Sequence, residues 1–419
     1  MTTKPNFADA MRVFARIGLL SFGGPAAQIA LMHRMIVDEK GWLTEKQFLN
    51  ALSFCMLLPG PEAMQLATFA GWRLHGTWGG LAAGLLFVAP GAIIVLVLAA
   101  LYAHFGQTPL IEAVFLGVKA AVVVIVVEAL LKLARRALKR WDHWFLAGLA
   151  FFAIFALTLP FPLIVVAAAL YGFARGGAGP AEPARIAVSP ASSLRTALIW
   201  AAIWAAPVAA AWLVYGDGFL IDLARFFSTL AVVTFGGAYA VLAYMAQDVV
   251  GGFGWLTTGE MMDGLGLAET TPGPLILVTE FVGFMAGFRE GGLWLAFVAA
   301  MLTLWVTFAP CFLWIFVGAP YIDWLGSQPR LAGALTAISA AVVGVILNLS
   351  LWFALHVIFV EVSAQTVGPL MLWTPTLASL DWRVPALAAL AAALLFWRKW
   401  SVAKMLGALA LAGLAIANV

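Results

Sequence analysis

Charged residues are scarce in this sequence of 419 residues: Asp, Glu, Lys and Arg make up 10% of it, and hydrophobic residues make up 64%. Soluble globular domains carry about 25% charged residues. Together with a mean hydropathy of +1.01, this scarcity excludes a water-soluble domain. The alternation of apolar and polar residues that spanning β-strands require is also missing. These absences leave an all-α polytopic membrane protein.

Cysteine and histidine are too few and too scattered to build a site. The two cysteines, Cys55 and Cys311, lie far apart in apolar runs, so no disulfide framework is indicated. The histidines show no metal-ligand spacing, and we expect no metal. No phosphate-binding loop ending in Lys-Ser/Thr is present, so ATP drive would need another subunit. We expect neither a cofactor nor a nucleic-acid partner.

Long apolar runs are abundant. Segments of roughly 17–25 apolar residues recur along the chain, which is the length that an α-helix needs to cross a bilayer. The first residues, MTTKPNFADAMRVFAR, lack the apolar core and cleavage site of a signal peptide. We therefore expect a multi-pass protein embedded in a lipid bilayer.

Three motifs occur twice in one register, since 235−22, 255−42 and 272−59 all equal 213. The pairs are Phe22-Gly23-Gly24 with Phe235-Gly236-Gly237, Trp42-Leu43-Thr44 with Trp255-Leu256-Thr257, and Pro59-Gly60-Pro61 with Pro272-Gly273-Pro274. With the register shifted by one residue, Phe69-Ala70-Gly71 aligns with Phe281-Val282-Gly283. Further along the two halves, Pro90 corresponds to Pro310. The sequence therefore predicts two homologous halves, a known transporter construction. Thr44 with Gln47, and Thr257 with Glu260, predict capping boxes that begin the helix leading into each Pro-Gly-Pro.

The two halves differ in basic residues, which favour the cytoplasmic side of short loops. The first half is rich in them, whereas only Arg289 is basic between Ala246 and Gln328. This asymmetry predicts inverted repeats separated by an odd number of crossings. We assign 1–178 to the first repeat, 179–218 to a cytoplasmic linker plus an extra membrane span at 196–214, and 219–419 to the second, inverted repeat.

Two segments of the first half, 17–32 and 47–72, are predicted to be broken or re-entrant helices. The first would extend about 24 Å as a helix, which is short for a crossing. Each has a glycine or proline break near its middle. Each repeat has two such segments. The chain crosses the membrane nine times if all four turn back, and thirteen times if all four cross.

The breaks suggest an anion site. A helix interrupted inside a membrane leaves backbone groups that only protein or a wet cavity can satisfy. If each Pro-Gly-Pro starts a new half-helix, the amides of the following residues are free, and a helix N-terminus binds oxyanions. We expect free amides at Gly60, Glu62, Ala63, Gly273, Leu275 and Ile276, further amides near Gly23, Gly24, Gly236 and Gly237, and an N-cap at Thr271. The alternative is that Pro-Gly-Pro only kinks helices for packing.

Few ionisable residues lie in the apolar segments, and each is a functional candidate. Glu62 is a structural first-turn acid or a proton-linked switch, and Glu269 and Glu280 pose the same question. Lys119 balances anion charge or pairs with an acid, and Gln65 can donate to an oxyanion. Arg16 lies at the interface or approaches the anion. A membrane enzyme would need paired acids, a nucleophile with a base or a metal cluster, and the sequence offers none.

The sequence resembles the chromate ion transporter family in its long two-domain form. The resemblance rests on FARIGLLSFGGPAAQIALMHRMIV, GWLTEKQFLNALSFCMLLPGPEAMQLATFAGWRLHGTWGG, TFGGAYAVL and LAETTPGPLILVTEFVGFMAG, and it covers both halves. It implies export of chromate through the inner membrane by a secondary mechanism tied to the proton gradient, giving chromate resistance. Carried over, the family's arginine before Phe-Gly-Gly is Arg16. The second repeat has Thr229 at that position, which argues against two symmetric arginines.

Rival interpretations remain within transport. Some members of the family are associated with sulfate, a tetrahedral dianion like chromate, so a sulfate or molybdate carrier is one alternative, and an anion channel is another. The sequence does not fix the oligomeric state, for which we consider a homodimer.

Overall fold

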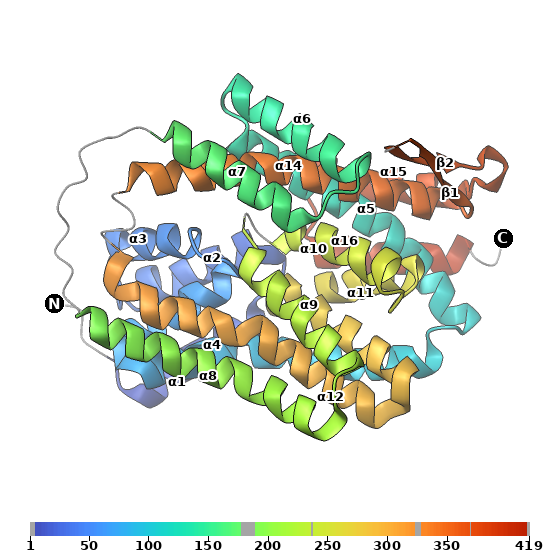
Figure 1. Ribbon diagram of the computed structural model, residues 1–419. Coiled ribbons are helices and arrows are strands. Elements are labelled where there is room, and N and C mark those ends of the chain that lie inside the picture. The colour runs from blue at the N-terminus through green and yellow to red at the C-terminus, as the bar shows by residue number, and fades with distance from the viewer. Residues whose placement is uncertain (1–4, 177–188, 236–237, 323–327, 369, 417–419) are drawn as a thin grey trace. The chain divides into compact units, whose positions relative to one another are not determined.

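The computed structural model describes residues 5–176, 189–235, 238–322, 328–368 and 370–416, which are almost entirely helical (Figure 1). The expected all-α architecture is confirmed, with one addition: an antiparallel β-hairpin of β1 (Val362–Val367) and β2 (Leu370–Pro375). The sequence pattern does not predict this hairpin, because two six-residue strands of mixed polarity leave no spanning signal.

The chain folds into two compact units, each assembled from separate stretches of sequence. Unit 1 comprises Met1–Ala100, Ala178–Ala238 and Thr271–Pro329, and unit 2 comprises Leu101–Gly177, Tyr239–Thr270 and Arg330–Val419. Both predicted repeats contribute to both units, so a repeat in the sequence is not a compact unit in space.

Unit 1 contains the helix breaks. Its elements are α1 (Phe7–Leu20), α2 (Gly24–His33), η1 (Arg34–Glu39), α3 (Glu45–Cys55), most of α4 (Glu62–Phe105), α8 (Pro190–Tyr215), α9 (Phe219–Val233), η3 (Leu275–Leu277), α12 (Val278–Gly318) and η4 (Ala319–Tyr321). Helix α8 contains the predicted extra span, and only 11% of its most apolar window is buried, so α8 offers an apolar face to lipid. Most of the predicted linker before α8 lies outside the described residues.

Unit 2 is a bundle with close helix contacts. Its elements are α5 (Pro109–Ala137), α6 (Trp141–Phe155), α7 (Phe161–Arg175), α10 (Ala238–Gln247), η2 (Asp248–Gly252), α11 (Thr258–Thr270), α14 (Pro329–Ile358), the β-hairpin, η5 (Leu377–Ser379), α15 (Arg383–Ala392), η6 (Ala393–Trp397) and α16 (Val402–Ile416). Helix α5 packs against α16, α15 and α11. A Cβ at Gly117 would lie 1.8 Å from the Leu409 carbonyl oxygen, so α5 and α16 touch through their backbones, as small residues allow in membranes.

Helices α4 and α12 are each a helical hairpin, with turns at His75-Gly76 and Gly291-Gly292, where the backbone leaves the helical region. A Cβ at Gly84 would lie 2.4 Å from Thr68 Oγ1. In one straight helix these residues would be about 24 Å apart. In α12, a Cβ at Gly283 would lie 2.4 Å from Thr303 Oγ1.

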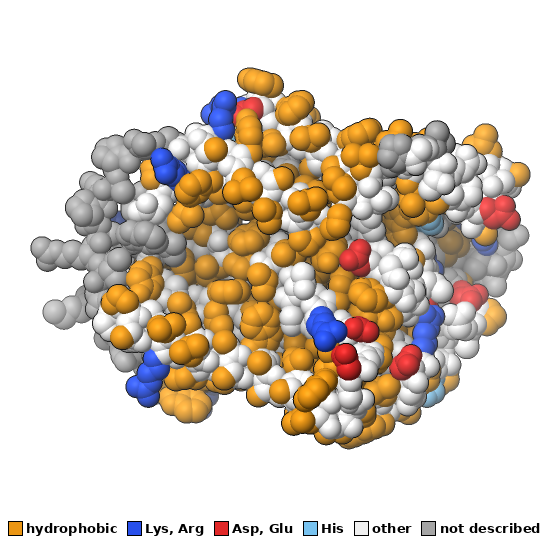
Figure 2. Space-filling view, in the orientation of Figure 1, with side chains coloured by type: hydrophobic (Ala, Val, Ile, Leu, Met, Phe, Trp, Pro, Cys, Tyr) orange, Lys and Arg blue, Asp and Glu red, His pale blue; other side chains and the backbone are white. Residues whose placement is uncertain are grey.

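The surface and the helix lengths agree with a membrane protein. Five helical stretches are long and apolar enough to span a bilayer, and four shorter apolar helices accompany them in the described part of the chain. The face shown in Figure 2 is covered largely by hydrophobic side chains, with few charged groups. The predicted interruptions of 17–32 and 47–72 are confirmed, since α1 gives way to α2 after Leu20 and α3 ends at Cys55 before α4 begins at Glu62.

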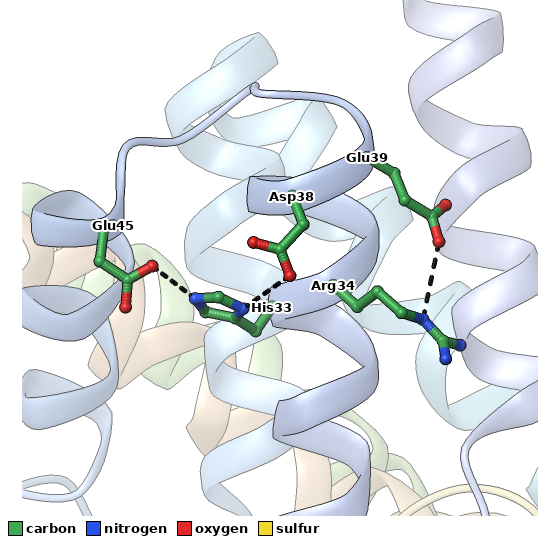
Figure 3. A network of polar contacts seen from close by, with 5 residues as sticks. All are labelled: His33, Arg34, Asp38, Glu39 and Glu45. Carbon is green, nitrogen blue, oxygen red and sulfur yellow. Dashed lines mark hydrogen bonds and ion pairs between the residues drawn. The ribbon is translucent and has the colours of Figure 1, made fainter.

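Local structure repeats with the sequence. Both predicted capping boxes are present: Thr44 N donates to Gln47 Oε1 (3.0 Å), and Thr257 N donates to Glu260 Oε2 (2.8 Å). Each capping box is preceded by a π-helical turn, η1 or η2. A backbone hydrogen bond at equivalent positions follows each of these turns. Trp42 N donates to Ile36 O (2.9 Å), and Trp255 N donates to Val249 O (2.9 Å). Figure 3 shows η1, which joins Arg34 to Glu39 (3.6 Å).

Candidate functional site

Each Pro-Gly-Pro lies in a break between two helices of its repeat. Helix α4 begins directly after Pro61, and η3, which leads into α12, begins directly after Pro274, so the predicted new helix starts are confirmed. The central glycines, Gly60 (φ +113°) and Gly273 (φ +96°), occupy the left-handed region that favours glycine. Thr271 is not the predicted N-cap, because the second helix starts after the last proline of the motif and Pro274 holds the capping position.

The two breaks are tied to the opposite repeat by matching backbone hydrogen bonds. Gly60 N donates to Thr234 O (2.9 Å), and Gly273 N donates to Ser21 O (2.9 Å). The acceptors are 213 residues apart (234−21), as are the donors (273−60). The expectation that the Gly60 and Gly273 amides are free is therefore wrong, because these two amides hold the breaks together.

The second arm of each hairpin also contacts the helix break of the opposite repeat. A Cβ at Gly91, next to Pro90, would lie 2.1 Å from the Pro272 carbonyl oxygen of the other repeat. Cys311, next to Pro310, lies against the other break, with its Sγ 3.0 Å from a Cβ placed on Gly60. The sequence pairing of Pro90 with Pro310 thus corresponds to equivalent places in the fold.

Two buried glutamines brace the breaks. Gln65 Nε2 donates to Pro59 O (2.6 Å), and Gln28 Nε2 donates to Gly273 O (2.7 Å). The predicted donor Gln65 therefore serves the backbone in this structure. Sequence reasoning missed Gln28, although a glutamine inside an apolar segment just after Phe-Gly-Gly is a signal that could have found it.

The start of α2 is the open part of this region. Gly23 (φ +85°) and Gly24 (φ +77°) lead into α2, whose first turn has no side-chain cap. Gly23 is exposed and Gly24 is half-buried, and Glu62 at the start of α4 is also half-buried. The second Pro-Gly-Pro is fully buried, and Gly236 and Gly237 lie outside the described residues.

The predicted charged candidates occupy different environments. Arg16 is exposed on α1, and Thr229, its counterpart, donates its hydroxyl to Arg225 O (2.8 Å). Glu280 is fully buried in the first turn of α12, and neither of its carboxyl oxygens has a hydrogen-bond partner among the residues that the structure describes.

Unit 2 holds Lys119 in a polar cluster. Its Nζ lies 3.2 Å from Asp263 Oδ1, and Asp263 Oδ2 accepts a hydrogen bond from Tyr102 (2.7 Å). Of the two interpretations of Lys119, pairing with an acid is the one that this geometry fits. Helix α11, which carries Asp263, also carries Glu269, and the carboxyl group of Glu269 accepts a hydrogen bond from the Tyr239 hydroxyl (2.8 Å).

Unit 2 also contains a cavity of about 510 Å³ beside the β-hairpin. Its lining includes Asp248, Asn348, His356, Trp352 and Trp373. The aspartate makes this cavity a poor match for an oxyanion.

Helix breaks that face one another across two repeats, inside an apolar helical protein, define the polytopic repeat class to which many secondary transporters belong. The family model described as chromate transporter matches residues 8–173 and 221–415, one region in each predicted repeat. The chain belongs to the chromate transporter family.

Curated relatives agree with this membership. A chromate transport protein of Pseudomonas aeruginosa is 35% identical over 343 residues, covering 80% of this chain and 77% of that protein. Another of Cupriavidus metallidurans is 30% identical over 341 residues, covering 80% and 79%. A probable chromate transport protein of Synechococcus elongatus is 29% identical over 336 residues, covering 80% and 81%. No solved structure matches the chain.

Proposed function

We propose that this protein exports chromate across the inner membrane by secondary active transport with alternating access, and thereby confers chromate resistance. The observation that carries the proposal is the family match in both repeats, together with the names of the relatives that share most of their length with the chain. The paired helix breaks of unit 1 support it, because such breaks can admit an ion without lipid contact.

The substrate is proposed to bind at the open ends of the breaks. The uncapped first turn of α2 at Gly23 and Gly24, and the first turn of α4, present helix N-termini that favour an anion. Glu62 would repel a bound dianion when it is ionised, so its protonation state would affect binding. Arg16 is the nearest cation along the chain before Phe-Gly-Gly. The motifs around Pro59, Pro61, Pro272 and Pro274 shape the breaks.

The test is radiolabelled chromate flux into inverted membrane vesicles, with and without a proton gradient and with sulfate as a competitor. Gradient-driven uptake that sulfate barely blocks is the expected result. Equal block by sulfate or molybdate would assign a general oxyanion carrier instead. Flux without counterflow and without response to ionophores would assign a channel.

A further inference from the structure

The α12 hairpin buries three polar side chains for which the described residues supply no hydrogen-bond partner. Glu280 and Thr303 are 0% exposed and Thr307 is 1% exposed. Within the described part of the chain, neither carboxyl oxygen of Glu280 and neither threonine hydroxyl has a hydrogen-bond partner. Buried polar groups in native proteins are nearly always paired, so such a cluster calls for an explanation.

The register of the hairpin places these three residues together. A Cβ at Gly287 would lie 2.7 Å from Leu295 O, and a Cβ at Gly283 would lie 2.4 Å from Thr303 Oγ1. The two arms of the hairpin are therefore antiparallel, so a residue one helical turn earlier on the first arm faces a residue one helical turn later on the second. Glu280 lies one turn before Gly283 on the same face, so it falls opposite the stretch from Thr303 to Thr307.

No charged partner reaches Glu280 among the described residues. The elements packed against α12, and α12 itself, carry these titratable groups: Glu45, Lys46 and Cys55 on α3, Glu62, Arg73, His75, Tyr102 and His104 on α4, Arg195 and Tyr215 on α8, Asp222 and Arg225 on α9, Tyr321 on η4, and Arg289, Glu290 and Cys311 on α12. None of them makes a hydrogen bond or ion pair with the carboxyl group. An unpaired carboxylate in a low-dielectric interior is strongly unfavourable, so this geometry favours the protonated form of Glu280.

We propose that Glu280, with Thr303 and Thr307 as its polar neighbours, is the proton-binding site that couples transport. This inference rests on the proposed secondary transport. In the closed hairpin the carboxyl group holds one proton. When the hairpin opens to one side, the proton leaves to water on that side and the carboxylate remains, hydrated. Rebinding of a proton from the other side allows the hairpin to close again.

Lys119 is excluded from this role by its ion pair with Asp263 in unit 2. Glu62 is half-buried and takes part in another interaction, whereas Glu280 is fully buried, so the cost of full burial applies to Glu280 and not to Glu62. The first hairpin has Thr68 where the second has Glu280 in the alignment of Phe69 with Phe281, and Thr68 donates to Met64 O (2.9 Å). Among the described residues, the first hairpin therefore has no acid at the position that corresponds to Glu280.

Two measurements on the purified full-length protein test the site. In infrared difference spectra between neutral and high pH, the wild type should show a protonated-carboxyl band that Glu280→Gln lacks. Identical spectra of the two proteins would overturn the proton site, whether or not the protein moves chromate. Thr303→Val with Thr307→Val should shift the position of this band, because its polar surroundings change.

In proteoliposomes, Glu280→Gln should retain chromate exchange at equilibrium but lose the accumulation that a pH gradient drives. For each coupled proton, a gradient of one pH unit supports about a tenfold ratio of chromate concentrations across the membrane. Thr68→Val, the matched change in the first hairpin, should accumulate chromate normally. Gradient-driven accumulation by Glu280→Gln at the wild-type level would overturn the coupling role. If the wild type itself moves no chromate, the proposed function fails, and the infrared band alone decides the proton site.

Discussion

The two helical hairpins of unit 1 share one backbone plan and bury different chemistry. Both follow a Pro-Gly-Pro break, and both place a residue of the second arm, Gly91 or Cys311, against the break of the other repeat. In α4 the hydroxyl of Thr68 donates a hydrogen bond to its own helix, whereas in α12 the carboxyl group of Glu280 has no hydrogen-bond partner among the described residues. The symmetry of the two hairpins is thus a property of the backbone, whereas the fully buried acid Glu280 belongs to α12.

The two helix breaks also differ in how exposed they are. The first is partly open, since Glu62 is half-buried, and the second is fully closed around Gly273. A protein with two equal sites would show equal exposure and equal side chains. This one combines an open helix terminus in the first repeat with a buried acid in the second, as expected if one repeat receives the anion and the other holds the proton.

The largest effect is expected from Gly60→Leu and Gly273→Leu. Both glycines have a positive φ, and a Cβ at Gly60 would meet Cys311 Sγ and Gln65 Nε2 at 3.0 Å. Strain of about 1–3 kcal/mol at each break should abolish transport while the protein still inserts. Gly148→Leu is the control, because Gly148 is exposed on α6 and its Cβ would meet nothing within 4 Å. Normal flux in both break variants would remove the breaks from the mechanism.

Much of this fold can be predicted from the sequence because the repeat keeps its register. The 213-residue spacing, the capping boxes at Thr44 and Thr257, and the helix starts after Pro61 and Pro274 depend on local chemistry. The bond from Gly60 to Thr234 joins residues far apart in the chain, and no local pattern reports it. The partner of Lys119 is hidden for the same reason: Asp263 meets it only after α5 and α11 have packed.

The next largest effect should come from the paired acid of unit 2, which contrasts with the unpaired Glu280. Lys119→Met leaves Asp263, only 4% exposed, without its cation, a loss of about 3–5 kcal/mol for a buried pair. Since 26% of the Lys119 side chain is exposed, we expect the lower end of that range in thermal unfolding in detergent. Adding Asp263→Asn should restore most of the stability and keep an acceptor for Tyr102.

The control for this pair is Lys132→Met. Lys132 pairs with Glu128 at 2.7 Å, but 69% of its side chain is exposed. Exposed pairs contribute about 0–1 kcal/mol. Equal losses for Lys119→Met and Lys132→Met would mean that the Lys119–Asp263 pair is no more important for stability than a surface contact.

A smaller effect, of opposite sign in the two hairpins, sharpens their comparison. Glu280→Met replaces an unpartnered buried carboxyl with an apolar side chain of similar length, and should stabilise the protein by about 1–3 kcal/mol. Thr68→Val removes a satisfied hydroxyl and should destabilise it by about 0.5–1.5 kcal/mol. Thermal unfolding in the same detergent compares the two. Destabilisation by Glu280→Met would show that the acid has a partner in the folded state.

The smallest effect concerns His33, whose counterpart in the 213 register is Ala246. His33 lies between Asp38 (Nδ1 to Oδ2, 3.3 Å) and Glu45 (Nε2 to Oε2, 2.6 Å), as Figure 3 shows. The hydrogen bond to Glu45 raises the pKa of His33, aided by the charge of Asp38. A raised pKa in the folded state stabilises the fold fully below the unfolded value of about 6.5, and this stabilisation is lost as the pH rises through the folded pKa. His33→Gln should therefore destabilise the fold more at about pH 5.5 than at about pH 8.5, by less than about 1 kcal/mol because 28% of the side chain is exposed. Melting temperatures of the two proteins at both pH values measure this difference. A difference that does not change with pH would mean that the imidazole packs there without its charge.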